Sequence, residues 1–146
     1  MVLVDTPVWS LALRRKAIDL SPLERRITRN LHDLVQQSRV RLLGPTGQEV
    51  LSGIREESQF LRIGEHLRGF ANVELDASDY EEAARANNQC RRHGIAGSPV
   101  DLLICAVALR HNWQVFTTDR DFDHYRAVLH IQLFQLNRTQ ATDGSS

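Results

Sequence analysis

Five acidic residues stand where a parallel α/β fold gathers its ligands. Asp5 ends a short apolar run, Glu49 and Asp101 each follow a Thr or Ser by three positions, and Asp119 and Asp121 follow another apolar run. Carboxylates a few ångströms apart repel one another, and a divalent cation removes this repulsion. Oxygen ligands favour Mg²⁺ or Mn²⁺, ions that activate water and stabilise a leaving oxygen in phosphodiester hydrolysis. We therefore predict an acidic, metal-dependent hydrolytic site.

Each acid also has a purely structural interpretation. The stretches S-P-V-D (98–101) and T-G-Q-E (46–49) resemble S-P-L-E (21–24), and all three fit a capping box worth about 1 kcal/mol. Asp119 and Asp121 equally suit a polar loop followed by a helix N-cap. Asp5 is hardest to explain in this way, because a carboxylate at the end of a buried strand must find donors or a cation. We expect Asp101 both to start its helix and to face the metal.

Hydroxyl residues lie next to these acids, and they could orient the carboxylates or a bound water by hydrogen bonds; they are Thr6, Ser98, Thr117 and Thr118. Each of them equally suits a turn or a cap. The six histidines are scattered without metal-ligand spacing, and Cys90 and Cys105 fit no metal or redox motif. Carboxylates therefore remain the candidate ligands.

Alternating strands and helices must position these side chains. Strands are predicted over 2–4, 40–43, 114–117 and 131–136, with a weaker one over 70–75. Helices are predicted over 7–16, 21–37, 46–68 with a break near Gly53, 79–93, from residue 98 onward, and 121–128. This alternation favours an α/β fold with a parallel sheet, whose ligand sites lie at the carboxyl ends of the strands.

Composition points to one soluble domain. The chain has 146 residues with 42% hydrophobic and 25% charged residues, which suits a single domain over 1–136 followed by a polar, disordered tail over 137–146. The formal net charge is zero, which argues against a non-specific nucleic-acid coat. The N-terminus lacks the order of a signal peptide, and the run 102–109 is too short to span a bilayer. We expect a cytoplasmic protein without membrane attachment.

Four motifs in order resemble the PIN-domain ribonucleases, and within them the VapC-like toxins of toxin–antitoxin pairs. They are V-L-V-D-T-P-V-W near the start, G-P-T-G-Q-E-V-L-S-G, S-P-V-D-L-L-I-C-A-V-A and T-T-D-R-D-F, which together extend the resemblance from Met1 to about Leu136. The chain departs from the family pattern at Pro7, where Ser is frequent, and at Cys105, where Ala is common. Neither change removes a carboxylate.

The resemblance implies a PIN-like α/β domain with a parallel central sheet of about five strands flanked by helices. It implies a Mg²⁺- or Mn²⁺-dependent endoribonuclease, the toxin of a type II system, that cleaves structured RNA (tRNA or rRNA) to inhibit translation. It also implies a homodimer and a cognate antitoxin protein. The site carried over consists of Asp5, Glu49, Asp101 and Asp119, with Asp121 as a further metal ligand beside Asp5, Asp101 and Asp119. Candidate RNA-binding arginines are Arg14, Arg15 and Arg120.

Three other classes are weighed against this one. A phosphoacceptor signalling domain needs a late lysine, but Lys16 is the only lysine in the chain. A phosphatase with an aspartyl nucleophile needs a D-x-D after the first strand, and Pro7 occupies the position of the second Asp. A catalytically silent PIN-like RNA- or protein-binding module stays open as the alternative, and a metal-binding test discriminates it from the enzyme.

Overall fold

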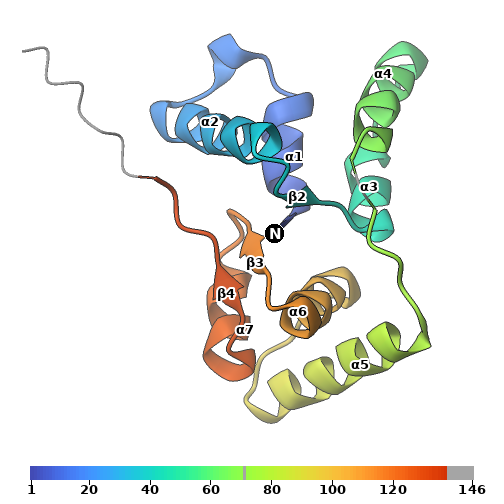
Figure 1. Cartoon of the computed structure of the whole chain (residues 1–146), viewed down its shortest axis with the longest axis vertical. Helices are drawn as coiled ribbons and strands as arrows, with labels where there is room; N and C mark the ends of the chain where they lie inside the picture. Colours follow the sequence, from blue (N-terminus) through green and yellow to red (C-terminus); the bar gives the residue numbers. More distant parts are fainter. Residues whose placement is uncertain (71, 138–146) are drawn as a thin grey trace, which may run out of the picture.

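A parallel sheet with the strand order β2-β1-β3-β4 forms the centre of the computed structural model, which describes residues 1–70 and 72–137 (Figure 1). The strands are short: β1 (Val2–Val4), β2 (Val40–Arg41), β3 (Gln114–Phe116) and β4 (Gln132–Leu133). All three pairings are parallel, with Leu3 opposite both Arg41 and Val115. The predicted parallel α/β architecture is therefore confirmed, and β1 lies inside the sheet.

The prediction of about five strands is wrong for the described residues, since the sheet has four. Residues 70 and 72–75 contribute an isolated parallel bridge, between Leu42 and Asn72, and beside it the Val73 N–H donates to the Leu42 carbonyl at 3.0 Å. Phe70 still belongs to the turn after the preceding helix, because its N–H bonds back to the Leu67 carbonyl. This bridge is isolated, so the described residues of the segment add no strand to the sheet.

Helices cover both faces of the sheet (Figure 1). Their bounds are α1 (Thr6–Leu13), the 3₁₀ turn η1 (Ala17–Asp19), α2 (Pro22–Gln36), α3 (Gly44–Leu51), α4 (Glu57–Arg68), α5 (Ala77–Arg92), α6 (Pro99–His111) and α7 (Asp121–Leu129). The expected break near Gly53 is present, and Gly53 has φ +86°, a conformation that favours glycine. It separates α3 from α4.

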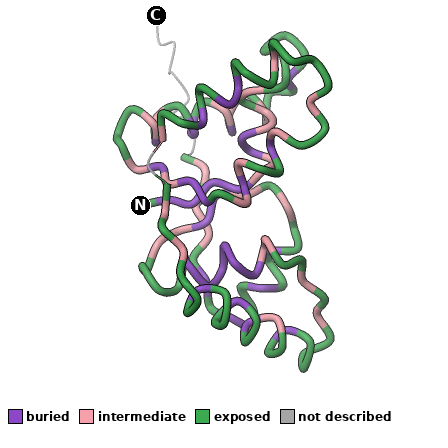
Figure 2. The backbone as a smooth tube through the Cα atoms, turned by 90° about the vertical axis from the view of Figure 1, so that its right-hand side faces the viewer, coloured by how far each residue is buried: buried purple, intermediate pink, exposed green. Residues whose placement is uncertain are grey.

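Two hydrophobic cores lie on opposite faces of the sheet because side chains alternate along each strand. Val2, Val4 and Phe116 pack with helices α1 to α4, whereas Leu3 and Val115 pack with α5, α6 and α7. Figure 2 shows the buried backbone running through the middle of the molecule, with exposed segments outside it. The apolar stretch of α6 is buried from Leu102 to Ala108, because α5 and α7 pack around it.

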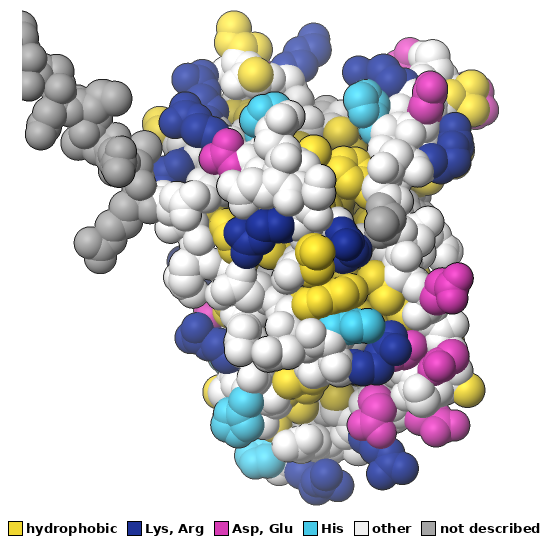
Figure 3. All heavy atoms as spheres, viewed as in Figure 1, with side chains coloured by type: hydrophobic (Ala, Val, Ile, Leu, Met, Phe, Trp, Pro, Cys, Tyr) yellow, Lys and Arg dark blue, Asp and Glu magenta, His cyan; other side chains and the backbone are white. Residues whose placement is uncertain are grey.

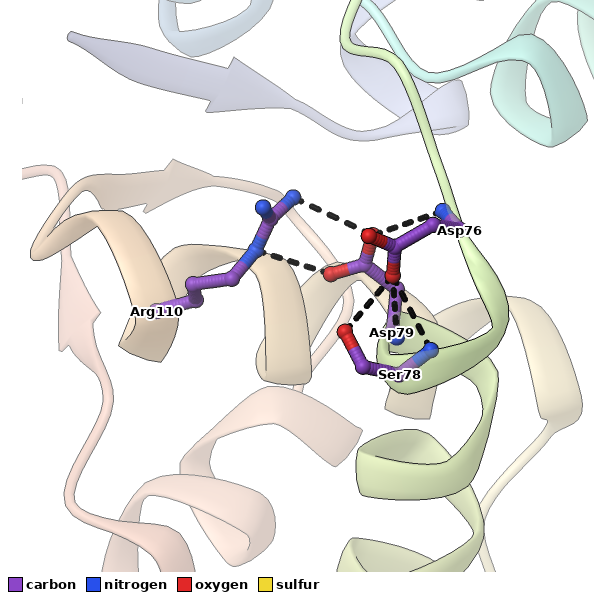
Figure 4. A network of polar contacts seen from close by, with 4 residues as sticks. All are labelled: Asp76, Ser78, Asp79 and Arg110. Carbon is purple, nitrogen blue, oxygen red and sulfur yellow. Dashed lines mark hydrogen bonds and ion pairs between the residues drawn. The ribbon is translucent and has the colours of Figure 1, made fainter.

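A network of polar contacts joins the start of α5 to the end of α6 (Figure 4). Asp79 is buried, and its carboxylate accepts from the Arg110 guanidinium at 2.8 and 3.1 Å. The same carboxylate accepts from the Asp76 N–H, while Asp76 accepts from the N–H groups of Ser78 and Asp79. This capping box fixes Asp79 beneath Arg110, so the guanidinium is held at a defined position.

The predicted tail over 137–146 lies outside the described residues except for Asn137, whose N–H donates to the Asn30 side chain at 3.0 Å. The division of the chain into a domain and a tail remains a prediction. Within residues 1–70 and 72–137, no helix has the length and apolar character that crossing a membrane requires.

Candidate active site

Asp5 is the most deeply buried member of the acidic set. It follows β1 directly and precedes α1, and 3% of its surface is exposed. Its backbone carbonyl accepts from the first turn of α1, where Pro7 lacks the N–H that the turn does not need. Its carboxylate accepts from the Thr117 hydroxyl at 2.8 Å, a contact that links the ends of β1 and β3.

Asp101, Asp119 and Asp121 come together at the same edge of the sheet. One carboxylate oxygen from each of them lies within 4.8 Å of the others. The Thr117 hydroxyl accepts from the Asp119 N–H at 3.0 Å, and the Asp119 carboxylate accepts from the Asp121 N–H at 2.9 Å. The loop between β3 and α7 is therefore ordered by the same residues that form the cluster.

Asp101 occupies a helix start without completing a capping box. The Ser98 hydroxyl accepts from the Asp101 N–H at 3.1 Å and so caps α6. The Asp101 carboxylate accepts from the Tyr125 hydroxyl at 3.0 Å instead of reaching back to the Ser98 N–H. In α2 the box is complete, because the Glu24 carboxylate does bond to the Ser21 N–H. Only the serine half of the predicted capping box at 98–101 is therefore formed. The Asp101 carboxylate, which would have made the other half, belongs to the acidic cluster instead.

The predicted capping box at 46–49 is wrong. Helix α3 begins at Gly44, with Pro45 in its first turn, so Thr46 lies inside the helix and is buried. Its hydroxyl has no hydrogen-bond partner among the described residues. Glu49 therefore lies beyond the first turn of α3, and its carboxylate accepts from the Thr6 hydroxyl at 2.7 Å. This contact ties Glu49 to the residue next to Asp5.

Burial and mutual repulsion raise the pKa values in this cluster. Burial raises the pKa of Asp5 to about 6, against the lowering effect of the Thr117 hydrogen bond, and repulsion from Asp101 and Asp119 adds to the rise. Burial also raises the pKa of Asp101, with further repulsion from Asp119 and Glu49. These interactions link Asp5, Glu49, Asp101 and Asp119 electrostatically, and Asp121 belongs to the group through its contacts with Asp119.

The donor set fits a hard divalent cation. It consists of carboxylates from four separate parts of the chain, which are the ligands that Mg²⁺ and Mn²⁺ prefer. In the described part of the chain, none of the ion pairs involves these five acids. The negative charge is thus left without a basic side chain to neutralise it. A cation at this position would satisfy the buried Asp5 carboxylate.

The arginines considered for RNA binding border this region. Arg14 and Arg15 line a cavity of about 560 Å³ that also touches Pro7 and Thr118, residues next to the acidic cluster. Arg120 is exposed, and it lies between Asp119 and Asp121 in the chain. Among the described residues, none of the three arginines forms an ion pair with an acidic site residue.

Tyr125 is the site residue that sequence reasoning missed. It is 1% exposed, it packs edge-on against Phe122, and its hydroxyl donates to Asp101. Its pKa is raised by burial and by the neighbouring Asp101. The spacing from Asp121 to Tyr125 is one helical turn, but a tyrosine on an amphipathic helix is ordinarily a core residue. No signal in the sequence indicated the contact.

Comparison with known proteins supplies the family. The family model described as "PIN domain" matches residues 2–128. Ribonuclease VapC11 of Mycobacterium tuberculosis is 26% identical over 134 residues, which cover 90% of this chain and 96% of the relative.

Two solved structures are similar in fold. One is VapBC2 from Rickettsia felis bound to a promoter DNA fragment, with a TM-score of 0.70, 13% identity and coverage of 94% of this chain and 100% of the other. The second is a toxin–antitoxin complex from Klebsiella pneumoniae, with a TM-score of 0.63, 19% identity and coverage of 84% and 90%. The match of nearly the whole chain to one family model, together with this shared fold, shows that the protein belongs to the PIN domain family.

Proposed function

We propose that this protein is a Mg²⁺- or Mn²⁺-dependent endoribonuclease that acts as the toxin of a type II toxin–antitoxin system. The observation that carries the proposal is the convergence of Asp101, Asp119 and Asp121 within 4.8 Å, beside the buried Asp5, in a member of the PIN domain family. The similarity to a VapC ribonuclease supports RNA as the substrate. Structured RNA such as tRNA or rRNA is the proposed target, and its cleavage would inhibit translation.

The roles of the acids follow from their surroundings. Asp5, Asp101 and Asp119 would hold the cation, with Asp121 as a further ligand. Glu49, positioned by the Thr6 hydroxyl, would ligate the ion or accept a proton from the attacking water. When bound, the cation would supply a water of lowered pKa and would neutralise charge that develops on the phosphate. In-line attack would leave a 3′-hydroxyl and a 5′-phosphate.

The hydroxyl residues would keep the carboxylates in position. Thr117 bonds to Asp5 through its hydroxyl hydrogen and accepts from the Asp119 N–H, so a single side chain orients two acids. Ser98 fixes the start of α6 and therefore the position of Asp101. Such positioning reduces the cost of arranging the ligands around an ion.

Partners are proposed from the same comparisons. The similarity of the fold to toxin–antitoxin complexes supports a cognate antitoxin protein as a partner. We also propose a homodimer in the cytoplasm. Arg14, Arg15 and Arg120 are the proposed RNA contacts near the acidic cluster. Arg14 and Arg15 line the cavity beside Thr118, and Arg120 lies between Asp119 and Asp121 in the chain.

The test is a transcriptome-wide map of new RNA 5′-phosphate ends after brief expression of the wild type and of Asp101→Asn. We expect discrete ends in one RNA class with the wild type and about a hundredfold fewer with the variant, because loss of a carboxylate at a metal site lowers metal affinity and activity. Asp123→Asn is the matched control, because Asp123 is exposed on α7 and its one ion pair among the described residues is with Arg126, at 3.9 Å. This control should cleave like the wild type.

A catalytically silent binding module is the alternative outcome. Equal end maps from the wild type and Asp101→Asn, with both proteins folded, would contradict the nuclease and favour that module. Calorimetric titration with Mg²⁺ then separates a metal-binding domain from one that binds no ion.

A further inference from the structure

A second polar cavity lies at the opposite end of α6 from Asp101. Its volume is about 460 Å³, and its lining includes Arg41, Asn72, Glu74, Arg110, His111 and Trp113. Asp101 and His111 stand ten positions apart on one helix, which places the cavity about 15 Å from the acidic cluster along the helix axis. We call it the His111–Trp113 cavity. None of the five acidic site residues lines it.

An aromatic pair forms one wall of this cavity. The rings of His111 and Trp113 are stacked, with their centroids 4.0 Å apart and their planes at 13°. His111 is exposed and Trp113 is half-buried against the core. Partial desolvation and the neighbouring Arg110 lower the pKa of His111, against the raising effect of Asp79. A stacked aromatic pair of this kind offers a face and an edge on which a nucleobase can stack.

Two arginines of the cavity have fixed guanidinium groups. Arg110 is held by the buried Asp79 through Nε and Nη2 (Figure 4). Arg41 is half-buried, and its Nη1 donates to the carbonyls of Val40 at 3.0 Å and Ser38 at 3.4 Å. Each guanidinium keeps further N–H groups without a hydrogen-bond partner among the described residues. Guanidinium donors that are already fixed in the free protein lose little side-chain entropy when they bind an anion. They are therefore suited to binding a phosphate oxygen.

Acidic and amide groups also line the His111–Trp113 cavity, and they indicate which kind of nucleic acid it could bind. Glu74 is exposed at the cavity and makes no ion pair within residues 1–70 and 72–137, and Asn72 offers an amide. Asp76 also lines the cavity, but its carboxylate caps the start of α5. A phosphate-lined duplex would be repelled by Glu74, but a nucleobase edge presents N–H donors that a carboxylate accepts. Figure 3 shows basic, hydrophobic and histidine side chains side by side on this face, with acidic side chains at its margin. The combination fits one unpaired nucleotide better than a helix.

We propose that the His111–Trp113 cavity is an RNA exosite, which stacks an unpaired base of the substrate against His111 and Trp113 and holds an adjacent phosphate with Arg41. The exosite rests on the proposed ribonuclease function for the identity of its ligand. Because it lies at the other end of α6, the RNA bound there must also contain a single-stranded stretch outside the cleaved phosphodiester. The cavity would therefore favour substrates that have a loop at this distance from the cleavage site.

The test measures RNA binding separately from cleavage. Asp101→Asn serves as the background, so that a short, unstructured, fluorescein-labelled RNA is not consumed during the titration. Arg41→Gln and His111→Ala are introduced into it. Arg85→Gln is the matched control, because Arg85 is exposed on α5 and, in the part of the chain that the structure describes, its one ion pair is with Glu82. Circular dichroism and thermal unfolding establish that each variant is folded.

The exosite proposal predicts three measurable differences between the variants and the background protein. His111→Ala weakens RNA binding at least about fivefold through the lost stacking. Arg41→Gln lowers the slope of log affinity against log salt concentration by about 0.7, the loss of one phosphate contact on a single strand. RNA quenches tryptophan emission in the background protein, and Trp113→Phe removes this quenching. Arg85→Gln matches the background protein in all three measurements.

The outcomes distinguish this proposal from the ribonuclease proposal. If Arg41→Gln and His111→Ala bind RNA as Arg85→Gln does, or if the background protein binds no RNA, the exosite is wrong whatever the end map shows. If binding depends on Arg41 and His111 but the wild type creates no new 5′ ends, the exosite stands and the ribonuclease proposal fails.

Discussion

Protonation of the buried Asp5 carboxylate is linked to the stability of the fold. Its pKa is raised from 3.8 to about 6, mainly by burial. The folded protein therefore keeps this proton to a higher pH than the unfolded chain does. Protonated Asp5 therefore contributes to the free energy of unfolding. This contribution is fully present below about pH 4 and is lost as the pH rises through about 6, and the loss is about 3 kcal/mol at most.

This linkage gives a pH prediction for the metal-free protein. In the presence of a chelator, the free energy of unfolding of the wild type should fall between pH 4 and pH 7, and Asp5→Asn should remove most of the fall. The asparagine stays neutral while it can still accept the Thr117 hydrogen bond. Urea unfolding across this pH range checks the difference. Parallel pH curves for the two proteins would show that Asp5 is not the group responsible.

Tyr125 is predicted to position Asp101. Tyr125→Phe removes the hydroxyl that donates to the Asp101 carboxylate and keeps the ring that packs against Phe122. We expect Mg²⁺ affinity, measured by calorimetry, to fall about tenfold, in line with losses of outer-shell partners at metal sites. Ser21→Ala is the control, because it costs about 1 kcal/mol of helix capping at the start of α2 and removes no contact of the acidic site residues. Equal Mg²⁺ affinities in the wild type and Tyr125→Phe would contradict the positioning role.

At the scale of elements, the loop before α6 must come close to both α6 and α7. A Cβ added at Gly97 would lie 2.0 Å from the Leu102 Cδ2 atom and 3.3 Å from a ring carbon of Tyr125. Leu102 and Tyr125 are both buried, so neither can move freely. The small residue before Ser98 is therefore needed to bring the start of α6, and with it Asp101, against α7.

Gly97→Ala should accordingly destabilise the protein by about 1–3 kcal/mol, the usual cost of overpacking a core. Gly44→Ala is the matched control, since a Cβ there would meet nothing within 4 Å. Denaturant unfolding of both variants checks the prediction. A Gly97→Ala protein as stable as Gly44→Ala would mean that the loop relaxes without disturbing α6 or α7.

At the scale of the whole molecule, the sheet brings acids from distant parts of the chain to one edge. Thr117 and Asp5 are 112 positions apart in sequence and joined by one hydrogen bond, and Thr6 and Glu49 are 43 apart. The chain carries zero formal net charge, yet these acids are concentrated at one place. A cation bound there would relieve repulsion that the folded state alone creates.

Divalent cations should therefore stabilise the folded protein. At a Mg²⁺ concentration about a hundred times its Kd, binding to the folded state alone adds about 2.7 kcal/mol to the free energy of unfolding. Thermal unfolding with and without Mg²⁺ should show a rise in Tm for the wild type at pH 7.5 and little change for Asp101→Asn. A rise of the same size in both proteins would place the bound ion elsewhere in the molecule.

The sequence by itself determined the order and type of most elements, because apolar periodicity and cap residues act over a few positions. It indicated the parallel α/β fold, the break at Gly53 and the acids of the candidate site, although their catalytic roles remain proposals. Local sequence patterns gave two wrong predictions, the start of a helix at Thr46 and a strand over 70–75. With Pro45 in its first turn, α3 begins at Gly44 and not at Thr46, and the described residues of segment 70–75 pair with Leu42 only through an isolated bridge.

Only the tertiary structure decided which partner each polar group takes. Asp101 could bond to its own helix start or to another element, and the packing of α7 resolved this by placing the Tyr125 hydroxyl at 3.0 Å. Tertiary packing likewise pairs Arg110 with the buried Asp79, which is 31 positions away in the sequence. It also forms the cavity that His111 and Trp113 line. Such contacts depend on how elements pack across the sheet, and packing depends on the whole chain rather than on neighbouring residues.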